Sequence, residues 1–519
     1  MKKKIKVYGP FGQQEEKVIM HIPFRYILAM FITAAETAAV LAIMYFLAFY
    51  IPHFWIAIGL TVLGCILAII NADDNPDYKL PWLVMVMAFP IVGFMIYFMY
   101  YSRKLPKKYV RRLGDIKDMN KRDDSSEIDA LKAEDICAYR QAVHLKNISG
   151  NYLYRNTRTK YYPLGEDMFA DMLTDLKAAE HFIFMEYFII EEGLFWNSIL
   201  DVLKEKAAQG VEVKVMYDDI GCMTTLPGNY ARQLQKLGID CVPFARLRGQ
   251  ANNEFNNRSH RKITSIDGRI AYTGGVNIAD EYINKIERFG HWKDTGLRME
   301  GEAARELTML FLGDYAMNRR KMPDISKFDI AVPAEGEGYM IPFGSGPRPM
   351  YERKVGQAVI ENMLNNAKDY IYMTTPYLII DNELTQTIEN AALRGVDVRI
   401  ITPHIPDKKL VFGMTRSSYK RLMDSGVRIY EYEPGFIHAK MYVSDDTTAM
   451  IGTINLDYRS LVHHFENGVW LYKDSAVMDI KRDILKTCDR SIEFKDIDIK
   501  DTLTRRFVRA VVKIFAPML

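Results

Sequence analysis

The chain has 519 residues, enough for roughly two to four domains with a large core. Its formal net charge of +3 is too small to indicate a nucleic-acid-binding protein. Its five cysteines are scattered without the spacing of a metal site or a disulfide framework, which is typical of a reducing compartment.

Three apolar segments follow a basic N-terminus, at about residues 26–51, 54–70 and 82–101. A membrane-spanning helix needs about 20 apolar residues. The third segment has this length, the second is at the lower limit, and the first is longer but carries Glu36, which is costly in lipid. Helices of a soluble core are the alternative, and a cleaved signal peptide does not fit a long first segment followed by two others. We therefore expect residues 1–101 to be an N-terminal membrane region with two or three apolar segments.

The charges beside these segments predict their orientation. Six basic residues lie from Arg103 to Arg112, whereas the loop between the second and third segments has three aspartates and one lysine. Because positive flanks stay in the cytoplasm, the loop is predicted outside and everything after Tyr101 inside. The basic N-terminus also favours the cytoplasm, and three full spans cannot place both ends there, so the first segment could be interfacial or re-entrant. We expect a multi-pass protein of the cell membrane whose later domains, including any catalytic lobes, are cytoplasmic.

Residues 102–135 are highly charged and predict a linker. Beyond them strands and helices alternate, and one pattern occurs twice, since residues 207–218 match residues 392–403. The period is too long for a solenoid, so we infer a duplicated α/β domain with a largely buried mixed sheet in each copy. A stretch rich in Gly, Pro and Glu after residue 332 marks the boundary. The expected lobes are residues 136–332 and 333–519.

A motif of the form H-x-K-x-x-x-x-D occurs once in each expected lobe, and an asparagine follows it at the same distance in both. The chain has only ten histidines, so two such copies are not expected by chance. The matched residues are His260, Lys262, Asp267 and Asn277 in the first lobe and His438, Lys440, Asp445 and Asn455 in the second.

Each motif lies on an expected strand, where alternate side chains share a face. The histidine and the lysine therefore point the same way, whereas Asp267 and Asp445 fall on the other face or in a turn, and we interpret them as structural partners. A neutral imidazole can attack phosphorus, and an imidazolium can protonate a leaving oxygen. The lysine ammonium and the asparagine amide can bind phosphoryl oxygens. Two facing half-sites would supply a nucleophile, an acid and an anion clamp without a metal or another cofactor.

The doubled motif resembles that of the phospholipase D superfamily, and the wider sequence is most similar to bacterial cardiolipin synthases over about residues 54–519. Matching stretches are residues 81–82, 90–93, 274–282, 375–377 and 517–519. The resemblance implies two pseudo-symmetric phospholipase D-like α/β lobes, with mixed sheets flanked by helices, preceded by N-terminal transmembrane helices. It also implies that the six His, Lys and Asp residues of the motifs form the catalytic set, with Asn277 and Asn455 binding the substrate phosphate.

A catalytic imidazole needs an acceptor on its other nitrogen. Glu466 fits the acidic residue that the superfamily places there, and Asp294 is at the matching position of the first lobe. We expect Asp294 beside His260 and Glu466 beside His438, with plain surface carboxylates as the alternative.

Four other polar residues end strands or flank the first motif. Glu186, Asp218 and Asp219 could hold substrate or order loops, and Arg258 could meet a head group or lie in a solvated loop. The C-terminal residues 505–519 predict an amphipathic helix that either packs on the domain or lies on anionic lipid.

The resemblance implies an enzyme that transfers a phosphatidyl group from one phosphatidylglycerol to another, releasing glycerol through a phosphohistidine. Its expected partners are phosphatidylglycerol and anionic membrane lipid, with no nucleic acid. We expect His260 to be the nucleophile and His438 the acid, because Arg258 and Arg261 would favour a neutral imidazole at His260 if they point inward. Near alternatives are a phosphatidylserine synthase or a phospholipase D. A nuclease is disfavoured by the membrane segments, and a lipid-binding scaffold with a dead site by the two complete motifs.

Overall fold

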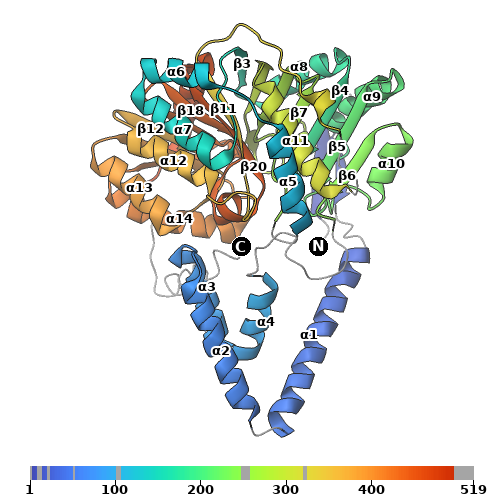
Figure 1. Cartoon of the computed structure of the whole chain (residues 1–519), viewed down its shortest axis with the longest axis vertical. Coiled ribbons are helices and arrows are strands. Elements are labelled where there is room, and N and C mark those ends of the chain that lie inside the picture. Colours follow the sequence, from blue (N-terminus) through green and yellow to red (C-terminus); the bar gives the residue numbers. More distant parts are fainter. Residues whose placement is uncertain are drawn as a thin grey trace.

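The computed structural model describes residues 3–8, 14–19, 24–50, 53–100, 107–246, 257–319 and 324–495. Two α/β lobes lie side by side, and an N-terminal group of helices extends from one side of them (Figure 1). The predicted C-terminal helix lies outside the described residues.

The first lobe is built on a mixed sheet with the strand order β3-β10-β8-β7-β4-β5-β6. Its strands are β3 (Thr157–Tyr162), β4 (Phe182–Tyr187), β5 (Glu212–Asp218), β6 (Asp240–Phe244), β7 (Lys262–Ile266), β8 (Ile270–Gly274) and β10 (Gly296–Gly301). Its helices are α8 (Gly165–Lys177), α9 (Leu194–Ala208), α10 (Tyr230–Lys236) and α11 (Ala304–Asn318). Every residue of β4 is buried, as expected of a central strand that is covered on both faces.

The second lobe repeats this order as β11-β20-β18-β17-β12-β14-β15 and adds β21 at the edge. Its strands are β11 (Tyr339–Ser345), β12 (Tyr370–Thr374), β14 (Asp397–Pro403), β15 (Arg428–Tyr432), β17 (Met441–Ser444), β18 (Thr448–Gly452), β20 (Glu466–Tyr472) and β21 (Ser491–Glu493). Its helices are α12 (Val355–Asn366), α13 (Asn382–Leu393), α14 (Lys409–Asp424) and α15 (Ser475–Asp489). The matching strand orders confirm the predicted duplication of a mixed α/β domain.

The lobes are joined through several smaller elements. Two parallel pairs, β13 (Leu378–Ile379) with β19 (Leu456–Asp457) and β9 (His291–Lys293) with β16 (Gly435–Ile437), lie outside the main sheets, and the second pair crosses between the lobes. Helix α11 packs on its own sheet and on β11, while α15 packs on its own sheet and on β3. Each lobe therefore covers part of the other, which fixes their relative position.

The segment predicted as a charged linker is mostly helical. It contains α5 (Lys107–Met119) and α6 (Ser125–Glu134), and α7 (Ile136–Ser149) follows. Helix α5 packs on α11 and buries Leu113 and Ile116. Helix α7, which the prediction assigned to the first lobe, packs on α12 and β11 of the second. Arg112 of α5 also donates to the carbonyls of Ala316 and Arg319, so this charged segment contacts the first lobe.

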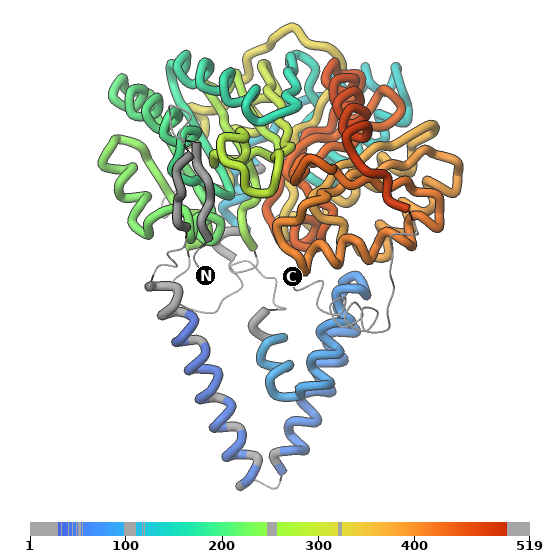
Figure 2. Tube along the Cα trace, turned by 180° about the vertical axis from the view of Figure 1, so that it is seen from behind, coloured from blue at the N-terminus to red at the C-terminus, as the bar shows by residue number. Residues whose placement is uncertain are grey.

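The N-terminal region contains a β1 (Lys3–Tyr8) and β2 (Gln14–Ile19) hairpin and helices α1 (Phe24–Tyr50), α2 (Phe54–Asn71), α3 (Pro76–Ala88) and α4 (Pro90–Tyr100). Helices α1 and α2 form a V whose apex points away from the lobes (Figures 1 and 2). Among the described residues, only Met30–Leu47 within α1 is long and apolar enough, by length and composition, to cross a membrane. The apolar part of α2, Trp55–Asn71, is shorter.

The third apolar segment has the predicted length but is divided between two helices, α3 and α4, so it is not one continuous span. The helix breaks at Phe89, because Pro90 has no N–H and restricts the residue before it. Gly93 then lets α4 fold back on α3, where a Cβ would overlap the Met85 carbonyl oxygen.

The acidic loop between α2 and α3 contacts the second lobe. Asn75 donates to Asp381 Oδ2 at 3.0 Å, and the Asn382 N–H, in the first turn of α13, donates to Asp77 Oδ2 at 2.6 Å. This contact disagrees with the prediction that the loop and the lobes lie on opposite sides of a membrane, and the N-terminus of α13 compensates the charge of Asp77.

Candidate active site

Two contacts between the lobes fix the motif histidines. The His260 N–H donates to the Phe465 carbonyl at 2.8 Å, and the His438 N–H donates to the Lys293 carbonyl at 2.7 Å. A bridge between Ser259 and Phe465 lies beside the first contact, and the β9–β16 pair lies beside the second. Each histidine is thus held by a backbone carbonyl of the other lobe.

The carboxylate beside each imidazole also comes from the opposite lobe. His260 Nδ1 lies 3.0 Å from both Glu466 carboxylate oxygens, and His438 Nδ1 lies 2.7 Å from Asp294 Oδ2. The expected pairing, Asp294 with His260 and Glu466 with His438, is therefore wrong. The backbone contacts explain the exchange, because each histidine is bound by the residue that immediately precedes the carboxylate of the other lobe.

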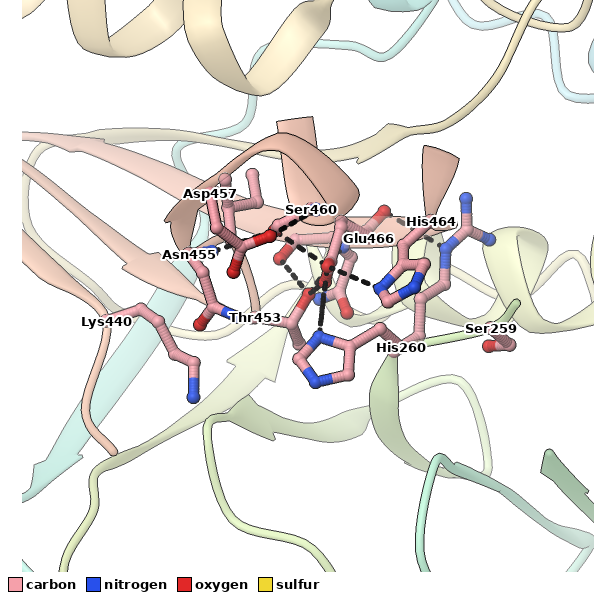
Figure 3. Close-up of polar contacts among 12 residues, drawn as sticks. Ser259, His260, Lys440, Thr453, Asn455, Asp457, Ser460, His464 and Glu466 are labelled. Atoms are coloured by element: carbon pink, nitrogen blue, oxygen red, sulfur yellow. Dashed lines mark hydrogen bonds and ion pairs between the residues drawn. The ribbon is translucent and has the colours of Figure 1, made fainter. Parts of the chain in front are cut away.

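Glu466 is surrounded by donors (Figure 3). The Thr453 hydroxyl donates to one carboxylate oxygen, and the Ser460 hydroxyl donates to the other at 2.7 Å. Burial raises the pKa of Glu466 to about 7, although Lys262 and the two hydroxyls act in the opposite direction. The other ring nitrogen of His260 points away from Glu466 (Figure 3). At neutral pH the carboxyl beside His260 is therefore only partly ionised.

Asp294 behaves differently although it occupies the equivalent position. Burial favours its neutral form, but His438 and Lys440 outweigh burial and hold the pKa of Asp294 below its usual value. The Thr295 N–H also donates to it at 2.9 Å. His438 therefore has a fully charged carboxylate as its neighbour, and the two half-sites differ in charge.

Both motif histidines have pKa values below the usual value and are therefore neutral at neutral pH. Burial, followed by Lys262 and Lys440, lowers the pKa of His260 well below its usual value. Burial and Lys440 lower the pKa of His438 to about 4, and Asp294 acts against that shift. A bound anion would offset the lysine charges and raise both pKa values.

The arginines expected to keep His260 neutral do not act on it in that way. The Arg258 guanidinium pairs with Asp218 at 2.9 Å, and the Arg261 guanidinium pairs with Asp314 at 2.8 Å. Both pairs are buried, so each arginine charge is compensated. The expectation that Arg258 meets a head group or a solvated loop is likewise wrong.

The motif lysines are buried against the histidine backbone. Lys262 Nζ donates to the His260 carbonyl at 2.6 Å, and Lys440 Nζ donates to the His438 carbonyl and lies 2.9 Å from His438 Nδ1. Burial lowers the pKa of Lys262 well below its usual value and the pKa of Lys440 to about 8. Their charges thus influence the imidazoles directly.

The motif aspartates hold strand ends together. Asp267 accepts the N–H groups of Glu180, His181 and Phe182 at the start of β4. Asp445 accepts the N–H groups of the equivalent residues at the start of β12, which are Lys368, Asp369 and Tyr370. This geometry agrees with their interpretation as structural partners.

The two asparagines differ. Asn277 accepts the Ile189 N–H at 3.1 Å and donates to the Tyr282 hydroxyl at 2.7 Å, so its amide is already engaged. The Asn455 side-chain oxygen is buried and has no hydrogen-bond partner among the described residues. Asn455 is the better placed of the two to receive a new polar group.

The other strand-end acids order loops. Asp218 accepts the Ile220 and Gly221 N–H groups at 2.9 Å, and Glu186 accepts the Ser259 hydroxyl. These two residues and Asp219 are buried but do not line the cavity described next.

A cavity of about 410 Å³ lies where the lobes meet. Its walls include the two histidines and two asparagines of the motifs and several aromatic side chains: Phe188, Tyr282, Phe289, Trp292, Tyr377, Phe436 and Tyr458. Apolar walls around a few convergent polar groups are typical of a site for an amphiphilic ligand.

His464 is a site residue that sequence reasoning missed. It lines the cavity, its ring centroid is 5.5 Å from that of His260, and its Nδ1 is 3.8 Å from Glu466 Oε1. The equivalent position of the first lobe is Trp292, whose ring centroid is 5.6 Å from that of His438. Sequence position could have identified both residues, because each stands two places before the carboxylate of its lobe.

One group within the described ranges has the composition of a metal site. His260, His464 and Glu466 place ligand atoms within 4.8 Å of one another. However, Glu466 already accepts two hydroxyls and lies beside His260, and Lys262 adds positive charge. These residues fit a hydrogen-bonded catalytic pair better than a cation site.

Comparisons with known proteins agree with this geometry. Residues 172–287 and 360–487 match the family described as "Cardiolipin synthase, PLD-like domain", and residues 59–99 match "Phospholipase_D-nuclease N-terminal". The phosphatidylserine synthase structure from Haemophilus influenzae superposes with a TM-score of 0.54 at 16% identity, covering 73% of this chain and 97% of that one. At this identity the similarity shows the fold alone.

Curated relatives match most of the chain. A Streptococcus mutans protein described as uncharacterized is 40% identical over 88% of this chain and its own full length. The cardiolipin synthase of Halalkalibacterium halodurans is 32% identical over 88% of this chain and 92% of its own, and that of Geobacillus kaustophilus is 34% identical over 83% and 87%. With two complete half-sites facing one cavity, the chain belongs to the cardiolipin synthase family of phospholipase D-like phosphatidyltransferases.

Proposed function

We propose that this chain makes cardiolipin from two phosphatidylglycerol molecules through a phosphatidyl-histidine. One observation carries the proposal: both motif imidazoles line a single cavity, and a carboxylate of the opposite lobe orients each of them. This arrangement supplies a nucleophile and a proton donor to the same phosphorus.

In the first step, the free ring nitrogen of His260 attacks the phosphorus of one phosphatidylglycerol. The bond from phosphorus to the head-group glycerol oxygen breaks, and His438 gives its proton to that oxygen, so glycerol leaves. In the second step, neutral His438 takes a proton from a glycerol hydroxyl of another phosphatidylglycerol. That oxygen attacks phosphorus, the P–N bond breaks, and cardiolipin leaves with His260 restored.

The charge difference between the half-sites supports this assignment of roles. The charged Asp294 stabilises an imidazolium at His438, as an acid requires. Burial, Lys262 and Lys440 keep His260 neutral, as a nucleophile requires, and Glu466 can accept from its Nδ1–H so that the other ring nitrogen is free. The expected roles are therefore retained, but carboxylates from the opposite lobes support them in place of the neighbouring arginines.

The lysines are suited to the phosphoryl group, and the buried Asn455 side-chain oxygen, which can only accept, is suited to a hydroxyl of the substrate. Lys262 and Lys440 are buried cations next to the histidines, and the Asn455 amide lines the cavity. A phosphodiester anion entering this site would be attracted by both ammoniums. Asn277 would order the wall through Tyr282 rather than bind phosphate directly.

We further propose that α1 and α2 insert into the membrane as a pair. Both expose large apolar side chains along their length: Met30, Phe31, Tyr45, Phe46, Phe49, Trp55, Ile56, Leu60, Leu63 and Leu67. Two passes put the N-terminus and the lobes on one side, which suits the basic N-terminus and the basic residues 103–112. The lobes would then be cytoplasmic.

The test is lipid chromatography after the purified full chain is incubated with phosphatidylglycerol in nanodiscs. Cardiolipin and free glycerol in equal amounts are the expected products. Phosphatidic acid alone would indicate a hydrolase, and phosphatidylserine formed on addition of serine would indicate a serine transferase. Either result would replace the proposed acceptor.

A further inference from the structure

A short segment at the wall of the active-site cavity exposes both apolar and basic side chains. We call residues 405–410, which run into the first turn of α14, the mouth segment. Ile405 is 37% exposed and Leu410 is 53% exposed, and Lys408 and Lys409 are exposed between them. Lys408 also lines the cavity. Large apolar side chains grouped with lysines at the edge of a cavity are unusual for a surface that meets only water.

The mouth segment is fixed to the cavity wall. The Tyr377 hydroxyl donates to Asp407, and Lys408 Nζ lies 5.9 Å from the centroid of the Tyr377 ring. The Ile405 N–H donates to the Gly435 carbonyl at 3.4 Å. Tyr377, Asp407 and Lys408 all line the cavity. The exposed side chains are thus presented from an ordered backbone that continues into the site.

Asp407, the one acid of this segment, is engaged by the Tyr377 hydroxyl, whereas its two lysines are exposed. Within the described part of the chain, neither Lys408 nor Lys409 has a carboxylate at ion-pair distance, and the first turn of α14 has no acidic residue. By contrast, Arg288 on the wall contributed by the first lobe pairs with Glu281 at 2.6 Å. The positive charge of these lysines lies beside Leu410 and Ile405, so it favours a partner that is both anionic and apolar.

We propose that the mouth segment docks onto an anionic bilayer surface. Ile405 and Leu410 enter the boundary between head groups and acyl chains, and Lys408 and Lys409 meet lipid phosphates. Helix α14 lies on the side of the second lobe that faces the N-terminal helices (Figure 1). A lipid head group released from this contact would pass Lys408 and enter the cavity without crossing open water. The role in substrate entry rests on the proposed function, whereas the docking contact does not.

A fluorescence experiment tests the docking. The environment-sensitive dye NBD is attached at Leu410→Cys in the full chain, with the accessible Cys65 and Cys137 changed to serine. Leu393→Cys is the matched control, because Leu393 is 70% exposed at the end of α13 and is not part of the cavity wall. In nanodiscs that contain phosphatidylglycerol, the emission of the dye at position 410 should shift to the blue and resist aqueous quenchers. The emission of the dye at position 393 should show neither effect. Equal spectra at both positions would overturn the proposal.

An activity experiment tests substrate entry. Turnover of phosphatidylglycerol in vesicles is divided by turnover of a short-chain phosphatidylglycerol that is soluble as a monomer. In Leu410→Glu and Lys409→Glu this ratio should fall roughly tenfold, because each variant places a negative charge against the anionic surface. Leu393→Glu should keep the wild-type ratio. An unchanged ratio in both mouth variants would overturn the entry role. Absence of cardiolipin from the wild-type chain would instead count against the proposed function and leave the fluorescence result standing.

Discussion

Glu466 follows His260 by 206 residues and belongs to the other lobe, yet both of its carboxylate oxygens lie 3.0 Å from His260 Nδ1. Asp294 and His438 form the mirrored pair. Each imidazole is therefore oriented by the lobe that does not carry it, and the charge state of each half-site depends on correct docking of the two lobes. The following predictions use this dependence and the difference between the two carboxylates.

A substrate with a good leaving group distinguishes the roles of the two histidines. With phosphatidylglycerol, His438→Ala should lose roughly 10²–10⁴-fold in turnover, because the glycerol oxygen needs a proton. With a p-nitrophenyl ester of phosphatidic acid, His438→Ala should still release a burst of p-nitrophenolate, which leaves without an acid. His260→Ala should release none. A burst from His260→Ala, or an adduct mapped by mass spectrometry to His438 alone, would reverse the roles.

Glu466 should make stability depend on pH. Its pKa is about 7 in the folded chain against an ordinary value of 4.5, so the folded chain binds more protons between these values. The contribution of Glu466 to the free energy of unfolding therefore falls as pH rises through this window. Glu466→Gln removes that slope, so the melting temperature of the variant minus that of the wild type should increase from about pH 5 to about pH 8.

Asp294→Asn is the matched control for this measurement. The pKa of Asp294 is already below its ordinary value of 3.8, so its stabilising charge is complete throughout the tested range. The variant should be less stable than the wild type by a constant amount. A slope in Asp294→Asn and none in Glu466→Gln would contradict the charge assignment of the half-sites.

Chelators should leave the reaction unchanged. The proposed chemistry uses two imidazoles and two ammoniums, and Glu466 is already engaged by hydroxyl donors. Turnover in EDTA should equal turnover without it. Loss of activity in EDTA that returns with a divalent metal would show that His260, His464 and Glu466 act as ligands.

Thiol labelling in intact cells tests the membrane arrangement. An impermeant thiol reagent should modify His53→Cys, which lies at the apex between α1 and α2. It should not modify Asp73→Cys, in the loop that contacts the second lobe, nor Lys108→Cys after α4. Modification of Asp73→Cys but not of His53→Cys would instead support the arrangement that the charge pattern alone predicts, in which the loop after α2 is outside.

Local sequence was sufficient for much of the site. The spacing of His260 and Lys262 on one strand, the turn position of Asp267 and the matching order of both lobes follow from the period of a strand and from the repeat. The identity of the two carboxylates followed from their equivalent positions. Their partners did not, because the two motifs are locally alike and only the crossing of β9 with β16 decides which lobe supplies which acid.

Other differences have the same origin in distant contacts. Arg258 is two residues from His260 in sequence, but Asp218, in another strand, neutralises it. The third apolar segment satisfies a count of apolar residues, whereas Pro90 and Gly93 decide its path. The charge pattern predicts an external loop after α2, whereas the Asn382 N–H donates to Asp77 and places this region against the second lobe.

The exchange of carboxylates between lobes has a consequence for the history of the chain. A single ancestral lobe would carry a histidine without its acid and an acid without its histidine. Two identical copies related by a two-fold axis would complete both half-sites at once, since the same patch meets itself in such a dimer. The present chain has the organisation of that dimer after gene fusion, and only after fusion could the carboxyls beside the two histidines evolve different pKa values.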